Sequence, residues 1–114
     1  MIKVCKFGGT SMADGTNMRR VADIVASDES RRYVVVSAPG KRFGGDAKIT
    51  DLLYETYRNV SETGSAGEAF GKVKERFRGI TGELGLDFDI DSLLADTEKE
   101  ILAERSEDFT ASRG

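Results

Sequence analysis

Two short apolar segments on either side of an amphipathic helix constrain the fold of this chain more than any other feature. Residues 2–7 are typical of a strand, and the β-branched run at residues 33–37 is typical of a buried parallel strand. Between them, four apolar residues have the spacing of one helix face: Met18, Val21, Ala22 and Val25. A helix over about residues 16–26 between two strands predicts a right-handed β-α-β unit, with both strands parallel and inside a sheet. The expected fold class is therefore α/β.

Three further helices are expected after the second strand. A Gly- and Lys-rich loop at residues 38–48 precedes the first, whose apolar face holds Ile49, Leu52, Leu53 and Thr56. A break at residues 64–67 precedes the second, whose face holds Phe70, Val73, Phe77, Ile80 and Leu84. The third carries Leu93, Leu94, Ile101 and Leu102, and it is expected to begin near Asp91 or Ser92. Because four helices need more sheet than two strands offer, we expect further strands and interpret residues 1–114 as part of one incomplete domain.

Histidine is absent from the 114 residues, and this absence excludes several kinds of site. Ser-His-Asp and Cys-His catalysis cannot arise within the chain, and the usual Cys/His zinc sites are excluded as well. The single cysteine, Cys5, cannot form an internal disulfide, which agrees with a reducing compartment such as the cytoplasm. Cys5 is expected to be a small buried apolar residue. Any chemistry must therefore come from lysine, arginine, carboxylates, hydroxyls or the backbone.

The charge distribution favours a small anionic ligand over a nucleic acid or a membrane. Residues 1–57 carry 9 Lys and Arg against 7 Asp and Glu, whereas residues 58–114 carry 8 against 13. A nucleic-acid-binding domain usually has a strongly basic face, but the formal net charge here is −3. No apolar run approaches the ~20 residues that a membrane span requires. A small anion bound near the slightly basic N-terminal half is compatible with this pattern.

The end of the first strand carries the candidate binding loop. Strand alternation places Lys6 on one face with two apolar residues, at the carboxyl end of the strand, where open α/β sheets bind ligands. Gly8 and Gly9 follow and permit a sharp turn that brings amide N–H groups to an anion, beside the hydroxyls of Thr10 and Ser11. The lysine precedes the glycines, so this is not a Walker A loop. The pattern predicts a phosphate-binding loop. The alternative interpretation of the same residues is a tight turn that binds no ligand, with Lys6 as an ordinary surface lysine.

The hexapeptide Lys-Phe-Gly-Gly-Thr-Ser at residues 6–11 resembles the opening motif of aspartate kinases, members of the amino acid kinase family. Two more segments match in the same order: residues 34–38 resemble the family's second strand, and residues 49–53 resemble the start of the helix after it. Beyond Leu53 the similarity rests on the helical pattern alone. The resemblance implies a three-layer αβα fold with a mainly parallel sheet. Residues 1–114 would be the N-terminal portion of the kinase domain, without its nucleotide half or the ACT regulatory domains.

The same resemblance implies an activity. Aspartate kinases use ATP and Mg²⁺ to phosphorylate the side-chain carboxylate of L-aspartate, and 4-phospho-L-aspartate enters lysine, threonine and methionine biosynthesis. By analogy, Lys6 would bind the ATP phosphates and stabilise the transition state, and Gly8 and Gly9 would donate backbone N–H groups. Thr10 and Ser11 would support the turn. The parent enzyme is expected to be a homo-oligomer, and the 114-residue chain alone is expected to be almost inactive.

Two hydroxyl residues are candidates for binding aspartate. Thr50, at a helix N-terminus where anions are favoured, resembles the residue that holds aspartate in the family, and its alternative is a helix-terminal hydroxyl without a ligand. Ser37 ends the second strand and either faces the same crevice or is structural. Three basic residues of the following loop, Lys41, Arg42 and Lys48, form either a mobile flap over the nucleotide or part of a solvated surface loop.

Two other functions remain open at this point. The chain could belong to another amino acid kinase that phosphorylates a different carboxylate or phosphate, which a panel of acceptors would distinguish. It could also be a non-catalytic module that holds an anion through the Gly-Gly loop or serves as an interaction domain. Activity that survives removal of the Lys6 ammonium group would favour this last possibility.

Overall fold

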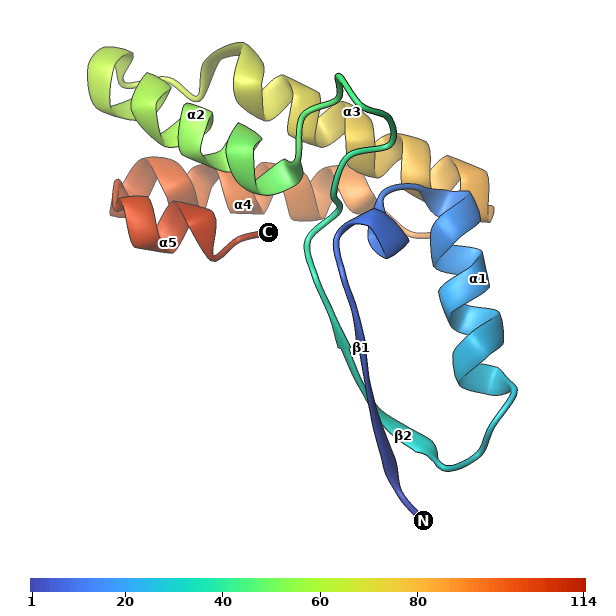
Figure 1. Ribbon diagram of the computed structural model, residues 1–114. Helices are drawn as coiled ribbons and strands as arrows, with labels where there is room; N and C mark the ends of the chain where they lie inside the picture. The colour runs from blue at the N-terminus through green and yellow to red at the C-terminus, as the bar shows by residue number, and fades with distance from the viewer.

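The computed structural model describes residues 1–114 as a β-α-β unit joined to a group of helices (Figure 1). β1 (Lys3–Phe7) leads through a short 3₁₀ helix, η1 (Thr10–Met12), into α1 (Gly15–Ala26), and β2 (Arg31–Val36) follows. The chain continues through α2 (Ile49–Thr63), α3 (Gly67–Leu84), α4 (Ile90–Glu104) and α5 (Glu107–Ala111). The α/β class and the expected order of strands and helices are confirmed. The sequence patterns did not predict η1 or α5.

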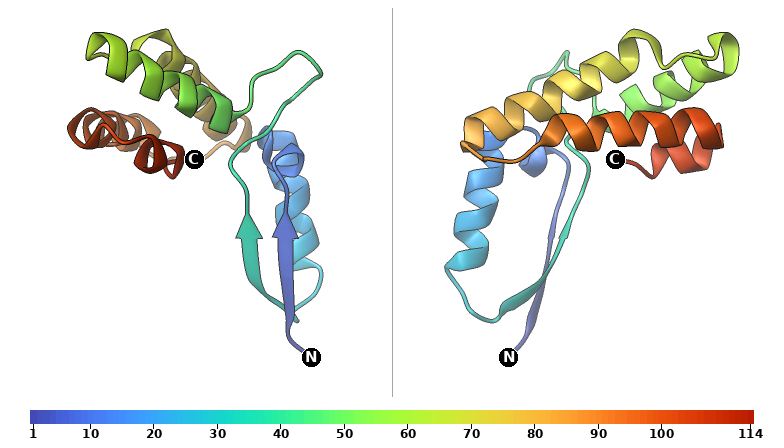
Figure 2. Two further views of the ribbon diagram at one scale, coloured as in Figure 1. Left: turned by 60° about the vertical axis from the view of Figure 1, so that its left-hand side comes forward. Right: turned by 180° about the vertical axis from the view of Figure 1, so that it is seen from behind.

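β1 and β2 form a two-stranded parallel sheet, as predicted, in which Lys6 pairs with Val35. The strands are not buried, however, and Val4 and Val35 are 70% and 51% exposed. The reason is that α1 covers only one face of the sheet, and no other part of the chain lies against the second face or the outer edges (Figure 2). The expectation that both strands lie inside a sheet is therefore wrong for these residues. Cys5, which was expected to be buried, is only half-buried for the same reason.

The hydrophobic core lies among α2, α3 and α4. Its buried residues are Ile49, Leu52, Leu53, Val60, Ala66, Phe70, Val73, Leu94 and Ile101. Most of them belong to the apolar faces that the sequence spacing predicted, because burial of one face is what stabilises a helix of this length. α4 begins one residue earlier than expected, since its cap is Asp89, whose carboxylate accepts a hydrogen bond from the Ser92 N–H at 3.1 Å.

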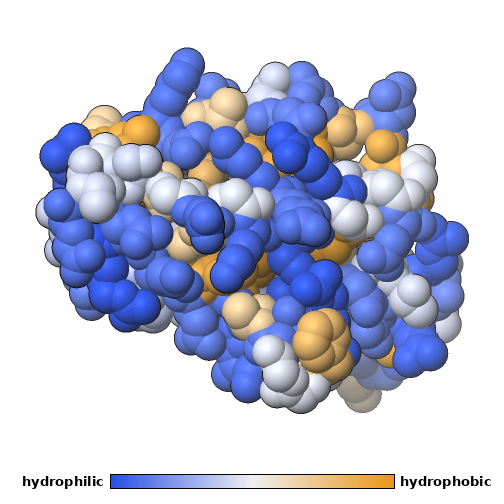
Figure 3. Space-filling view, turned by 90° about the horizontal axis from the view of Figure 1, so that it is seen from above, coloured by the Kyte–Doolittle hydropathy of each residue, from blue (hydrophilic) through white to orange (hydrophobic).

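The β-α-β unit is attached to the helices at the start of α1. Asp14 caps α1 by accepting a hydrogen bond from the Asn17 N–H at 2.9 Å. The N–H of Gly15 donates to the Glu83 carboxylate of α3 at 3.0 Å, which joins the two parts. Seen from above, the surface is mainly hydrophilic with scattered apolar residues (Figure 3). None of the helices combines the length and apolar character that crossing a lipid bilayer requires.

Candidate functional site

A polar cleft lies where the β1–α1 and β2–α2 connections meet. It has a volume of about 290 Å³ and is lined by Gly9, Thr10, Ser37, Ala38, Pro39, Gly40, Lys41, Lys48 and Thr50. The fold therefore brings together residues that the sequence predicted separately: the glycine turn after β1, the serine after β2 and the threonine in the first turn of α2. The lining contains two lysines and no acidic residue.

Three residues of the predicted phosphate loop do not line this cleft. Lys6 lies on β1 with an exposed side chain. Gly8 is exposed, and nothing lies within 4 Å of the position that a Cβ would occupy there. Ser11 lies half-buried within η1. The lysine of the motif is thus on the sheet, whereas the hydroxyl groups expected to act with it are beyond the end of the strand.

The polar side chains of the cleft have no partner within the chain. The hydroxyls of Thr10, Ser37 and Thr50 take part in no hydrogen bond, and the ammonium groups of Lys41 and Lys48 form no hydrogen bond or ion pair. No carboxylate lines the cleft beside these ammonium and hydroxyl groups, and the nearest acidic residue of α2 is Asp51 in its first turn. The first turn of α2 adds the partial positive charge of a helix N-terminus. This arrangement favours an anionic ligand.

The turn after β1 adds unpaired backbone donors. The N–H groups of Gly8 and Gly9 donate no hydrogen bond within the chain, although Gly9 is only half-buried and Gly8 is exposed. Consecutive free N–H groups beside a strand end are a common means of binding phosphate oxygens. The donor set of the site therefore consists of amides, hydroxyls and ammonium groups, all of which suit an anion.

Gly9 and Gly40 bring the two connections into direct backbone contact. The Gly40 N–H donates to the Gly9 carbonyl at 2.8 Å. A Cβ on Gly40 would lie 2.6 Å from the Gly9 carbonyl carbon, and a Cβ on Gly9 would lie 3.2 Å from the Ala38 carbonyl oxygen. Gly9 itself has φ −60° and ψ −37°, an ordinary right-handed conformation. Glycine at this position therefore eases the close approach of the two backbones and is not required by a sharp turn, which corrects the expected role.

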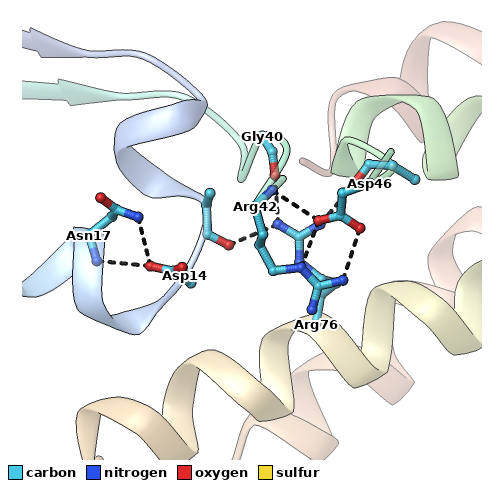
Figure 4. Close-up of polar contacts among 8 residues, drawn as sticks. Asp14, Asn17, Gly40, Arg42, Asp46 and Arg76 are labelled. Atoms are coloured by element: carbon cyan, nitrogen blue, oxygen red, sulfur yellow. Dashed lines mark hydrogen bonds and ion pairs between the residues drawn. The ribbon is translucent and has the colours of Figure 1, made fainter. Parts of the chain in front are cut away.

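Arg76 of α3 binds both connections from the side of the helices (Figure 4). Its Nη2 donates to the carbonyls of Ala13 and Gly40 at 2.8 and 2.7 Å. Its Nη1 donates to the Ala47 carbonyl at 2.8 Å and to the Asp46 carboxylate at 3.3 Å. Burial lowers the pKa of this guanidinium, and its Nε has no hydrogen-bond partner. Sequence reasoning did not single out this residue.

An ion pair within the 38–48 loop gives it a defined shape. Arg42 Nε and Nη2 donate to the two carboxylate oxygens of Asp46 at 2.6 and 2.9 Å, and the Arg42 N–H donates to the same carboxylate at 3.0 Å. Arg42 therefore faces Asp46 (Figure 4), whereas Lys41 and Lys48 line the cleft. The loop is neither an unattached flap nor fully solvated, because Asp46 also accepts a hydrogen bond from Arg76.

The Arg42–Asp46 ion pair predicts a pH dependence of stability. Hydrogen bonds from Arg42 hold the pKa of Asp46 well below its usual range. A depressed pKa stabilises the folded state above the unfolded-state pKa of about 3.9, and this stabilisation is lost as the pH falls through the folded-state pKa. At neutral pH we expect the unmodified protein to have a larger free energy of unfolding than the Asp46→Asn variant. This difference should shrink below about pH 4. Urea unfolding of both proteins at a series of pH values measures this difference. A difference that does not change with pH would contradict the stabilising role of the ion pair.

The chain is similar to known proteins over most of its length. Residues 1–112 match the Amino acid kinase family. Aspartokinase 3 of Bacillus subtilis is 48% identical over 85 residues, which are 75% of this chain and 19% of that protein. The structure of an aspartate kinase from Clostridium acetobutylicum superposes with a TM-score of 0.92 at 41% identity, covering 97% of this chain and 26% of that chain.

A second solved structure was determined with ligands bound. Aspartokinase III of Escherichia coli, in complex with aspartate and ADP, superposes with a TM-score of 0.74 at 31% identity over 100% of this chain and 26% of that chain. The chain therefore spans between 19% and 26% of the length of these relatives.

Proposed function

Because this chain belongs to the amino acid kinase family, we propose that it forms the N-terminal part of the catalytic domain of an aspartate kinase. The reaction transfers the γ-phosphoryl group of ATP to the side-chain carboxylate of L-aspartate, giving ADP and 4-phospho-L-aspartate. The observation that carries the proposal is the cleft with its unpaired lysines, hydroxyls and neighbouring free amides. The related enzyme in complex with aspartate and ADP supports the choice of acceptor and nucleotide.

The phosphates of ATP suit the end of the cleft nearest β1. Gly8 and Gly9 offer N–H groups to the phosphate oxygens, and Lys41 and Lys48 offset the negative charge. Thr10 adds a hydroxyl donor. These donors suit phosphate oxygens and not a metal ion, so none of them would hold Mg²⁺ directly. A Mg²⁺ ion bound together with the nucleotide would offset the negative charge of its phosphates.

L-aspartate takes the end of the cleft nearest α2. Thr50, in the first turn of that helix, holds the acceptor together with the Ser37 hydroxyl. The attacking carboxylate is already ionised at neutral pH, since its unperturbed pKa is about 3.9. No general base is required, and the reaction depends on positioning and on stabilising the charge of the transferred phosphoryl group. The absence of histidine from the chain is therefore compatible with this chemistry.

Lys6 lies outside the cleft lining, but its long side chain is exposed and has no partner within the chain, and we propose that it reaches the transferred phosphoryl group. In the natural gene product that carries this chain, Lys6→Met is expected to lower kcat by about 100-fold, the usual effect of removing one donor to the transition state. The matched control is Lys3→Met, which removes a lysine of the same strand that pairs with Asp28 at 2.7 Å. A Lys6→Met enzyme with activity within a few-fold of the control would favour a non-catalytic role.

The reaction itself is tested by ADP release from the same gene product with a panel of acceptors. L-aspartate should be preferred over glutamate, acetylglutamate and nucleoside monophosphates. A preference for one of the other acceptors would identify a different member of the family. ADP release that does not depend on any acceptor would contradict phosphoryl transfer to aspartate.

A further inference from the structure

We propose that Arg76 is a positioning residue that fixes the spacing between the two connections forming the anion cleft. The proposal rests on the proposed role of that cleft in binding phosphate. Arg76 lies on α3 and is not among the residues that line the cleft. It acts on the ligand through the backbone that carries the ligand's contacts.

One guanidinium joins segments that are far apart in the sequence. Nη2 is shared between the carbonyls of Ala13, in the β1–α1 connection, and Gly40, in the β2–α2 connection. Nη1 holds the Ala47 carbonyl near the end of the second connection. These acceptors are next to the ligand-binding residues in sequence, since Gly40 precedes Lys41 and Ala47 precedes Lys48. The positions of both cleft lysines thus depend on the same side chain.

The contact between the glycines makes this spacing strict. The Gly40 N–H donates to the Gly9 carbonyl; a Cβ on Gly40 would clash with the Gly9 backbone, and a Cβ on Gly9 would be in tight contact with the Ala38 carbonyl. Arg76 accordingly draws Gly40 toward Ala13 on one side while the Gly9 backbone limits the approach on the other. A small displacement of this pair would move the free N–H of Gly9 relative to Lys41.

The shape of the Arg76 side chain matters as well as its burial. The residue is 6% exposed, and its Nε has no partner. Removing one member of a buried ion pair usually lowers stability, so a loss of stability alone does not test a positioning role. A lysine would keep the charge, but its single ammonium group cannot place donors on both connections at once, as the planar guanidinium does. What the guanidinium alone provides here is simultaneous bonding to Ala13, Gly40 and Ala47.

The test compares Arg76→Lys with Arg78→Lys in the natural gene product. Arg78 lies on the same helix, but it is exposed and pairs with Asp91. Inorganic tripolyphosphate serves as the probe in isothermal titration calorimetry. Peptide-level hydrogen exchange over residues 38–48 gives a local readout that a uniform loss of stability would not reproduce. We expect Arg76→Lys to weaken tripolyphosphate binding by about tenfold or more and to speed exchange in that segment, with Arg78→Lys unchanged.

A second variant decides the matter if Arg76→Lys does not fold. Gly40→Ala leaves Arg76 intact but forces the connections apart, and it should weaken binding to a similar extent. Normal binding in Arg76→Lys, or in Gly40→Ala when the lysine variant is unfolded, would overturn the role of Arg76 and leave the cleft's function intact. Failure of the unmodified protein to bind tripolyphosphate would overturn the phosphate site itself, and this proposal with it.

Discussion

Replacing Phe70 by alanine is expected to destabilise the protein by about 3–5 kcal/mol, the usual range for truncating a buried phenylalanine. Phe70 is 1% exposed and belongs to the core among α2, α3 and α4. Truncation removes its dispersion contacts and leaves a cavity that rigid neighbouring helices fill only in part. Since small domains are stable by about 5–15 kcal/mol, this loss is a large fraction of the total. Urea unfolding followed by circular dichroism measures the change.

Phe88→Ala is the matched control for this measurement. Phe88 precedes α4 and is 56% exposed, so its truncation should change the free energy of unfolding by about 0.5 kcal/mol or less. Equal effects of the two substitutions would contradict the position of the core among the helices. A loss below about 1 kcal/mol for Phe70→Ala would contradict it as well, because such a value is typical of a partly exposed site.

The double substitution Lys41→Met, Lys48→Met is expected to weaken tripolyphosphate binding by about 100-fold or more. The two ammonium groups supply the positive charge of the cleft lining. A hydrogen bond to a charged group contributes about 1.5–3 kcal/mol, and each 1.4 kcal/mol corresponds to about tenfold in affinity. Isothermal titration calorimetry measures the affinities. The control is Lys72→Met, Lys99→Met, which removes the same charge from exposed positions on α3 and α4.

The comparison between the two double variants separates a site from a general charge effect. If binding depends on the cleft, the control should bind tripolyphosphate within a few-fold of the unmodified protein. Equal losses in both variants would indicate that net charge alone attracts the anion, because long-range attraction depends on total charge and is screened by salt.

Local patterns were sufficient to predict both strands and the four longer helices, but not η1 or α5. The spacing of apolar residues determines which helix face is buried, so α2 and α3 follow from Leu52, Leu53, Phe70 and Val73. Burial of the strands was not predictable in the same way. A β-branched run such as that of β2 indicates a strand, but its exposure depends on which elements lie beside it, and here only α1 covers the sheet.

The cleft was predictable in part, because its residues follow the carboxyl ends of parallel strands. Ser37 and Thr50 meet Gly9 there, as the topology requires. The position of Lys6 at the carboxyl end of β1 predicts that it projects into the same crevice, but a strand end does not fix how far a side chain reaches, and Lys6 is not among the residues that line the cleft.

Arg76 was missed because a single arginine within an amphipathic helix ordinarily belongs to the solvated face. Its spacing, three residues after Val73 and four before Ile80, does place it on the buried face of α3. That signal was available in the sequence, but its partners were not. They are backbone carbonyls of distant connections, and only the fold brings them together.

Nuclear magnetic resonance of the protein titrated with Mg-ATP tests the central claim most directly. The amide signals of Gly8 and Gly9 should shift together with those of Thr10, Lys41 and Lys48, and the shifts should saturate. The Lys41→Met, Lys48→Met variant should lose this response while keeping its folded spectrum. A phosphate site in this cleft would be contradicted by signal shifts centred on residues away from the cleft. It would also be contradicted by the absence of shifts at ATP concentrations well above about 1 mM, the upper end of common KM values.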